Sequence, residues 1–130
     1  RPMIDYLKKG NLVWYAPDLD LGAKHSIFAP FFDVQAATLP APTKLAKLTG
    51  CKVYLISFYR QNNGKGYTLK IENSLNDFPS GDDEKDIQQV NLAVEKIIRQ
   101  HPEQYLWQYK RFHTRPEGGV SVYATNNEGS

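Results

Sequence analysis

The chain has 130 residues, which is enough for one domain with a hydrophobic core and too few for two. Its hydrophobic content of 41% and charged content of 23% are those of an ordinary globular protein, so a wholly disordered chain is excluded. A net charge of +2 gives no support for a nucleic-acid partner. The single cysteine, Cys51, excludes an internal disulfide and a cysteine-based zinc site. No apolar run approaches the roughly 18 residues that a membrane-spanning helix needs.

The first predicted elements are the end of a helix and a buried strand. Met3 to Lys9 has helical character, and Gly10 is a typical helix stop. Leu12 to Ala16 is continuously apolar and rich in strand formers, which predicts a strand buried on both faces. The loop Pro17 to Gly22 would then follow the carboxyl end of this strand, where ligands usually bind in open α/β sheets.

The middle of the chain predicts strands around one helix. Ser26 to Phe32 is apolar but contains a proline, so we expect an edge strand or an extended loop. Thr38 to Thr49 reads as a helix that ends at a glycine. Cys51 to Arg60 and Gly66 to Asn73 read as strands, and the Asn-Asn-Gly in the connector 61–65 predicts that they form an antiparallel hairpin.

The strongest helical pattern runs from about Asp83 to Gln100. Its apolar face recurs at intervals of three and four and consists of Ile87, Val90, Val94, Ile97 and His101. After Pro102, the side chains of Tyr105 to Trp107 are expected to be buried. These elements together predict an α/β domain with a mixed β-sheet and flanking helices over residues 1–116, followed by a flexible tail over residues 117–130.

The loop Pro17 to Gly22, the acidic loop, is the first candidate site. Asp18 and Asp20 could position a hydroxyl, an amine or a metal, and Gly22 would let the backbone turn tightly. The alternative is an Asx-turn in which Asp18 merely caps the backbone amides that follow it. Calcium is rejected, because the fifth position of an EF-hand pattern is Gly here and no Glu closes a twelve-residue loop. We expect no metal.

The second candidate is the C-terminal segment, Tyr105 to Pro116, in which aromatic and basic residues alternate. Lys110, Arg111 and Arg115 beside aromatic rings suit a phosphate group on an amphipathic molecule. They equally suit single-stranded nucleic acid. The alternative is a packed segment whose rings fill the core while its cations stay in water. The three histidines are expected to be structural, although His25 follows the acidic loop closely enough to belong to a site.

These pieces, in this order, resemble the late acyltransferases of lipid A biosynthesis, which transfer lauroyl and myristoyl groups. The resembling stretch runs from about Lys8 to Gly118. Each anchor is weak alone, but their order and spacing are specific. The anchors are residues 13–22 (VWYAPDLDLG), 28–32 (FAPFF), 36–38 (AAT), 102–107 (PEQYLW), 110–112 (KRF) and 114–116 (TRP).

The resemblance implies a membrane-associated enzyme at the cytoplasmic face of the bacterial inner membrane. Such an enzyme moves a fatty acyl chain from acyl carrier protein to a hydroxyl of a Kdo-bearing lipid A precursor, without a cofactor and without a nucleic-acid partner. A histidine in a His-x4-Asp or His-x4-Glu motif is the base that activates the hydroxyl in this family. The present sequence lacks that motif, so no catalytic residue is assigned. We expect an N-terminally truncated part of a glycerolipid-acyltransferase-like domain, inactive alone.

By the same resemblance, the acidic loop matches a block that lies near the acceptor site in the wider glycerolipid acyltransferase group. Asp18, Asp20 and Gly22 are therefore expected to shape the pocket, whereas the cations Lys110, Arg111 and Arg115 are expected to meet lipid phosphates or the acidic carrier protein. The alternative function is a non-catalytic module that holds an anionic lipid or RNA through the C-terminal segment.

Overall fold

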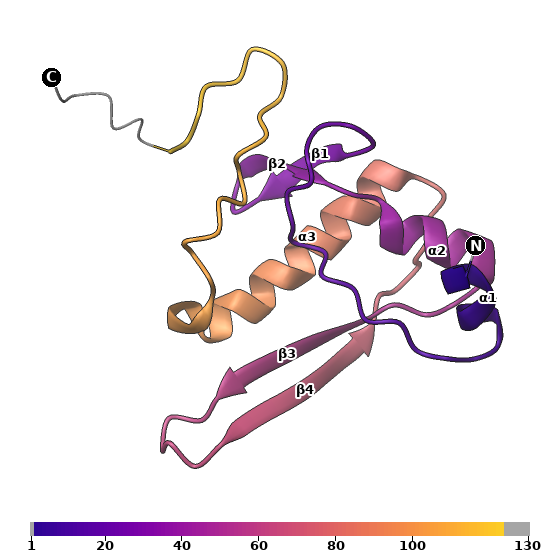
Figure 1. Cartoon of the computed structure of the whole chain (residues 1–130), viewed down its shortest axis with the longest axis horizontal. Coiled ribbons are helices and arrows are strands. Elements are labelled where there is room, and N and C mark those ends of the chain that lie inside the picture. Colours follow the sequence, from indigo (N-terminus) through magenta and orange to yellow (C-terminus); the bar gives the residue numbers. More distant parts are fainter. Residues whose placement is uncertain (1, 124–130) are drawn as a thin grey trace, which may run out of the picture.

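A computed structural model describes residues 2–123 of the chain (Figure 1). Three helices, one short 3-10 helix and four strands make up the described part. In chain order they are α1 (Pro2–Lys8), β1 (Ile27–Phe31), β2 (Val34–Thr38), α2 (Ala41–Thr49), β3 (Tyr54–Arg60), β4 (Tyr67–Ser74), α3 (Asp83–Gln100) and η1 (Pro102–Gln104). The α/β class is thus confirmed at the level of helices and strands packed in one unit.

The strands form two separate antiparallel hairpins, β1–β2 and β3–β4. The prediction of one mixed sheet was therefore wrong for residues 2–123, where no parallel pair of strands occurs. The hairpin predicted from the Asn-Asn-Gly connector is confirmed, with Phe58 opposite Leu69 and Ile56 opposite Ile71. Figure 1 shows this hairpin projecting away from the other elements.

The β1–β2 hairpin has a two-residue turn, Phe32 and Asp33, with φ values of 48° and 60°. Positive φ at both positions matches the twist of paired strands, as in a type I′ turn. Neither residue is a glycine or asparagine, the usual signals for such a turn. Sequence reasoning therefore anticipated β1 as an edge strand but missed β2, and it wrongly began the following helix at Thr38, which is the last residue of β2.

Helix α3 spans the residues predicted for it, because its ends carry strong signals. The Asp82 side chain accepts hydrogen bonds from the backbone amides of Glu84 and Lys85, which satisfies two of the free amides at the helix start. Its predicted apolar face buries Ile87 and Val90, but near the end Ile98 is buried and the predicted Ile97 is only partly buried. His101 caps the C-terminus, as expected.

A small core joins α3 to the β1–β2 hairpin and to the C-terminal segment. Phe31, Ala36 and Ile98 are buried at its centre. Phe112 packs against it from the C-terminal segment, with its ring centroid 5.9 Å from that of Phe31. Asn91 ties the helix to the strands, since its amide donates to the Pro30 carbonyl oxygen at 3.1 Å. The core therefore depends on residues that are far apart in the sequence.

The segment predicted as a strand buried on both faces does not form one. Residues 12–16 have no strand assignment, and Leu12 and Trp14 are 91% and 78% exposed. Apolar strand formers adopt a ladder only when a partner strand supplies hydrogen bonds, and none of the described strands pairs with them. Leu106 and Trp107, also expected to be buried, are largely exposed.

None of the helices within residues 2–123 is both long enough and apolar enough to cross a membrane. The predicted tail begins inside the described part at residue 117, but residues 124–130 lie outside it. Before that boundary, the Tyr123 hydroxyl accepts a hydrogen bond of 2.9 Å from the Phe112 amide. The flexibility of residues 117–130 stays a prediction.

Candidate functional site

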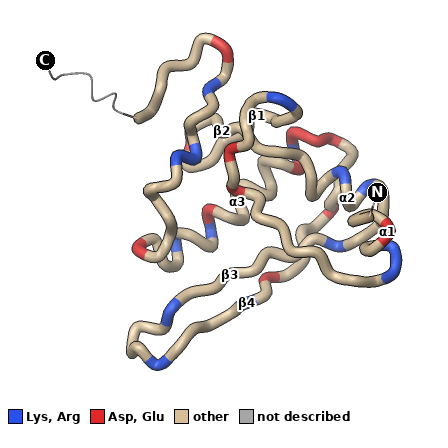
Figure 2. Tube along the Cα trace, viewed as in Figure 1, with Lys and Arg blue, Asp and Glu red and all other residues tan. Residues whose placement is uncertain are grey.

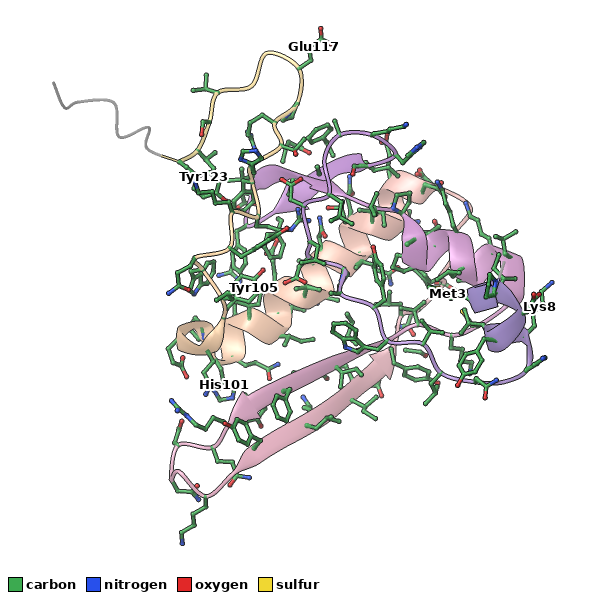
Figure 3. All side chains as sticks on the ribbon, viewed as in Figure 1. Met3, Lys8, His101, Tyr105, Glu117 and Tyr123 are labelled. Atoms are coloured by element: carbon green, nitrogen blue, oxygen red, sulfur yellow. The ribbon has the colours of Figure 1, made fainter. Side chains whose placement is uncertain are left out.

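The acidic loop and the C-terminal segment, predicted separately, lie against each other. The Tyr105 hydroxyl donates a hydrogen bond of 2.8 Å to Oδ2 of Asp18. The Tyr109 hydroxyl accepts one of 2.7 Å from the Asp20 amide. Figure 2 shows the red of the loop close to blue of the C-terminal segment, above α3, and Figure 3 labels Tyr105 there. Two tyrosines four residues apart therefore hold the loop.

Asp20 makes the most connections in this region. Its Oδ1 accepts from the Gly22 amide at 3.0 Å, so the loop does contain an Asx-turn, but Asp20 makes it and not Asp18, to which the alternative had assigned it. Its Oδ2 accepts from the Thr114 amide at 2.7 Å. Burial raises the pKa of the Asp20 carboxyl, but the hydrogen bonds from Thr114 and Gly22 outweigh it and leave the pKa below its usual value. The charged Asp20 carboxylate thus connects the acidic loop to the C-terminal segment.

Gly22 has the backbone conformation that the sequence suggested. Its φ of 89° lies in the region that L side chains rarely adopt, and a Cβ there would meet nothing within 4 Å. The glycine is therefore required by the turn and not by a close neighbour. The carbonyl of Gly22 accepts a 2.6 Å hydrogen bond from the Ser26 hydroxyl, which fixes the way the chain leaves the loop.

Arg111 is buried, with only 2% of its surface exposed. Its guanidinium donates to the Ala37 carbonyl oxygen and to Oγ1 of Thr38, both at 2.7 Å, and lies 5.4 Å from the centroid of the Phe31 ring. Burial lowers its pKa, although the nearby hydroxyls and carboxylates of Tyr105 and the acidic loop act in the opposite sense. Arg111 therefore connects the C-terminal segment to β2 inside the fold.

The other two predicted cations stand nearer to solvent. Lys110 is exposed, with Nζ 5.8 Å from the centroid of the Tyr123 ring. Arg115 is half-buried and donates from one guanidinium nitrogen to the Gln35 carbonyl oxygen at 2.6 Å. Both lie on the segment that the acidic loop holds. Binding of substrate by any of the six predicted residues stays a prediction, and Lys110 and Arg115 are the cations best placed for it.

His25, which could have belonged to the site, is exposed at a φ of 66°. Among the hydrogen bonds and ion pairs of residues 2–123, none joins a histidine to Asp18 or Asp20. The described residues also contain no group of three histidine, cysteine or carboxylate side chains that could hold a metal. The local arrangement is a network of hydrogen bonds, without a base poised beside an acidic partner.

Two open cavities lie between the β3–β4 hairpin and α3. One, of about 260 Å³, is lined by Leu55, Leu75 and Ile97 with the charged ends of Glu72 and Lys96. The other, of about 100 Å³, lies between Ser57 and His101, with Tyr105 in its wall. Neither of these two cavities is lined by Asp18 or Asp20 or by any of the three predicted cations.

Sequence reasoning missed the residues that connect the site. Tyr105, Tyr109 and Thr114 contact the acidic loop, and Thr38 receives Arg111. The spacing of four residues between the two tyrosines was a usable signal for the first contact. Thr38 belongs to the AAT anchor of the resemblance, but no signal in the sequence connected it with Arg111, because strand β2 was not predicted.

Comparison with known proteins gives one consistent answer. Residues 1–114 match the family model described as bacterial lipid A biosynthesis acyltransferase. The chain is 44% identical over 122 residues to the lipid A biosynthesis lauroyltransferase of Escherichia coli (strain K12), which covers 93% of this chain and 40% of that protein. It is 40% identical over 124 residues to the palmitoleoyltransferase of the same organism, covering 95% of this chain and 40% of that protein.

A lipid A biosynthesis myristoyltransferase of Escherichia coli (strain K12) is 32% identical over 125 residues, which are 95% of this chain and 38% of that protein. The chain thus spans about two-fifths of the length of the relatives it matches. The predicted resemblance is confirmed, and so is the class of enzyme. The chain belongs to the bacterial lipid A biosynthesis acyltransferase family.

Proposed function

We propose that this chain is the acceptor-side part of an acyltransferase that moves a fatty acyl group from acyl carrier protein to a hydroxyl of a Kdo-bearing lipid A precursor. The acceptor oxygen attacks the thioester carbonyl and forms an ester, while the carrier's thiol leaves and takes up a proton. A base must remove the proton of the attacking hydroxyl. In this proposal the base comes from sequence outside these 130 residues, at the cytoplasmic face of the inner membrane.

Family membership is the observation that carries the proposal. The junction of the acidic loop and the C-terminal segment supports it, because Lys110 and Arg115 are held on a fixed backbone by the contacts of Asp18 and Asp20. A fixed pair of cations suits the phosphates of a lipid headgroup better than cations on a free chain, since less conformational entropy is lost on binding. Arg111 takes no direct part, because its guanidinium is bonded inside the fold.

A transfer assay tests the missing base. The isolated chain, given acyl carrier protein thioester and a lipid A precursor, should show no turnover. A chimera in which this chain replaces the matched stretch of the E. coli lauroyltransferase should transfer the acyl group. Turnover by the isolated chain would refute the missing base, and an inactive but folded chimera would refute the acyltransferase role of this stretch.

A binding assay tests the two cations. Lys110→Ala and Arg115→Ala in the chimera should each weaken binding to vesicles that carry the lipid A precursor, by roughly fivefold to tenfold for a charge-assisted contact. Lys44→Ala, which removes an exposed cation from α2, is the matched control and should leave binding unchanged. Equal binding by all three variants would remove these residues from the site. Loss of RNA binding without any lipid binding would instead favour a nucleic-acid module.

A further inference from the structure

The β3–β4 hairpin exposes an apolar face that faces away from the rest of the described chain. Ile56 is opposite Ile71 and Phe58 is opposite Leu69, so these side chains share one face. Phe58, Leu69 and Ile71 are 65%, 60% and 63% exposed. We name this the outer face, and its apolar members are Tyr54, Ile56, Phe58, Tyr67, Leu69 and Ile71. One charged residue, Arg60, lies on the same face opposite Tyr67, at the end next to the turn.

The opposite face of the same hairpin carries the more polar residues. Ser57 pairs with Lys70 and Tyr59 pairs with Thr68, on the side that faces α3. Tyr59 stacks on His101 with ring centroids 4.0 Å apart. A hairpin packed on one side normally turns its apolar face inward. Here the polarity is reversed, so the outer face has the composition of a buried surface.

The edges of this hairpin point to the kind of partner. Strands β3 and β4 pair only with each other among the described strands, so each has an outer edge without a partner strand. At Arg60, the Gln104 side chain both donates to the backbone carbonyl at 2.9 Å and accepts from the amide at 2.7 Å, as a neighbouring strand would. The edge of β4 has no such strand beside it. Free edges in native sheets are usually paired or blocked.

The unpaired strand edges favour a protein partner over a lipid one. Hydrocarbon could cover the outer face, but it offers no hydrogen bonds to the open edges, and each unsatisfied backbone group in lipid costs several kcal/mol. A protein segment can cover the face and pair with the edges at once. The relatives supply such a segment, because about 60% of each lies outside the match that covers 40%.

We propose that the outer face and the free edge of β4 form the surface on which the remaining 60% of the acyltransferase docks, extending the β3–β4 sheet with further strands. This inference rests on one element of the proposed function, namely that the chain works as part of a longer acyltransferase. Figure 1 shows the hairpin projecting, and Figure 3 shows side chains on both sides of it, which the docked part would enclose. The segment Leu12 to Ala16, in which Leu12 and Trp14 are exposed, has the strand-forming composition to join the same extended sheet.

The test uses the chimera with the E. coli lauroyltransferase, transferred to detergent-free buffer before labelling and carrying one cysteine at a time, with Cys51 and the other cysteines replaced by serine. Leu69→Cys should react with a maleimide at least about tenfold more slowly in the native chimera than in urea. Lys44→Cys on α2 is the exposed control and should react at similar rates in both. In parallel, Leu69→Lys should leave the melting temperature of the isolated chain unchanged but lower that of the chimera by several degrees.

Each other outcome overturns the proposal. Fast labelling of Leu69→Cys that slows only when anionic vesicles are added would assign the outer face to a membrane surface. Slowing that depends on protein concentration would assign it to a second copy. A chimera that stays insoluble, when the unmodified E. coli enzyme does not, would show that the surface rejects the docked part. Acyl transfer is measured separately. Slow labelling of Leu69→Cys in a chimera that transfers no acyl group would refute the proposed function and leave the docking surface supported.

Discussion

The Tyr105 hydroxyl donates a 2.8 Å hydrogen bond to Oδ2 of Asp18, although the two residues are 87 positions apart. This contact joins the start and the end of the domain. Desolvation raises the pKa of the Tyr105 hydroxyl strongly, and the neighbouring Asp18 charge adds to the effect. The hydroxyl therefore stays a donor throughout the physiological range, and the loop and the segment behave as one structural unit.

The first prediction concerns this contact. Tyr105→Phe keeps the ring that packs against the core but removes the donor to a carboxylate. The free energy of unfolding should fall by about 1–2 kcal/mol, since hydrogen bonds to charged groups have values in this range. Urea unfolding followed by fluorescence measures the change, with the exposed Tyr67→Phe as control. Equal stability of the two variants would show that the Asp18 contact does not hold the segment.

The second prediction is a pH dependence that Asp20 causes. Its pKa is lower in the folded chain than in the unfolded chain, so its charged form stabilises the fold above a pH of about 4. That stabilisation is lost as the pH falls through the folded-state pKa. The stability difference between the wild type and Asp20→Asn should therefore be largest near neutral pH and should shrink below about pH 4.

Thermal melts of both proteins at a series of pH values give this difference directly. Glu117→Gln removes one carboxylate from an exposed position and corrects for the change in net charge. A difference that grows in acid would mean that Asp20 has the opposite linkage. Asp20→Ala should be less stable than the wild type as well, because the amides of Gly22 and Thr114 then lose their acceptor.

The third prediction separates Arg111 from its neighbour Lys110. Arg111→Ala removes a donor from the buried Ala37 carbonyl oxygen and from Oγ1 of Thr38, which then keeps only the 3.4 Å hydrogen bond from the Asn91 amide. The change should cost about 3 kcal/mol of stability. Arg111→Lys should recover only part of this, because an ammonium lacks the planar fork that reaches both oxygens. Lys110→Ala should change stability by less than about 0.5 kcal/mol.

Chemical unfolding of the three variants checks this ranking, and binding to lipid vesicles is measured on the same samples. We expect substitutions of Arg111 to lower the stability and the substitution of Lys110 to weaken lipid binding. An Arg111→Ala variant that unfolds like the wild type but no longer binds lipid would restore the sequence-based role of Arg111 as a phosphate contact.

Much of the fold was predictable wherever local signals agreed. Helix α3 has its stripe and an Asp82 cap, and the β3–β4 hairpin has alternation and an Asn-Asn-Gly turn. The strand expected at Leu12 to Ala16 was wrong because a strand depends on a partner, and composition says nothing about whether one is present. The outer face shows the same limit, since its apolar pattern correctly gave a strand but not what covers it.

The site was predictable in part for a similar reason. The sequence motifs identified the acidic loop and the C-terminal segment as candidate sites, and the two segments are in contact in the structure. Which member of each set is buried depends on tertiary packing. Arg111 and Arg115 look alike in the sequence, and both donate to a backbone oxygen of β2. Only Arg111 is buried, at 2% exposed, and it also donates to the Thr38 hydroxyl.

The last prediction concerns the turn between β1 and β2, whose residues gave no sequence signal for a hairpin. Phe32 and Asp33 both have positive φ, which costs non-glycine residues free energy. Asp33→Gly removes that cost without removing an apolar contact, so the chain should become more stable by about 0.5 kcal/mol. Phe32→Gly relieves the same strain but deletes a ring that lies 4.9 Å from the centroid of Phe31 and 4.9 Å from the Arg99 guanidinium.

The two glycine variants should therefore shift stability in opposite directions, with Phe32→Gly lower by about 2 kcal/mol or more. The Phe32 amide donates to Oε1 of Glu95 at 2.6 Å, which a glycine amide can retain, so the loss measures the ring. Differential scanning calorimetry of the two variants gives both signs in one experiment. If Asp33→Gly lowered the melting temperature, the left-handed conformation at this position would not be a source of strain, and the turn would owe its shape to the Asp33 side chain.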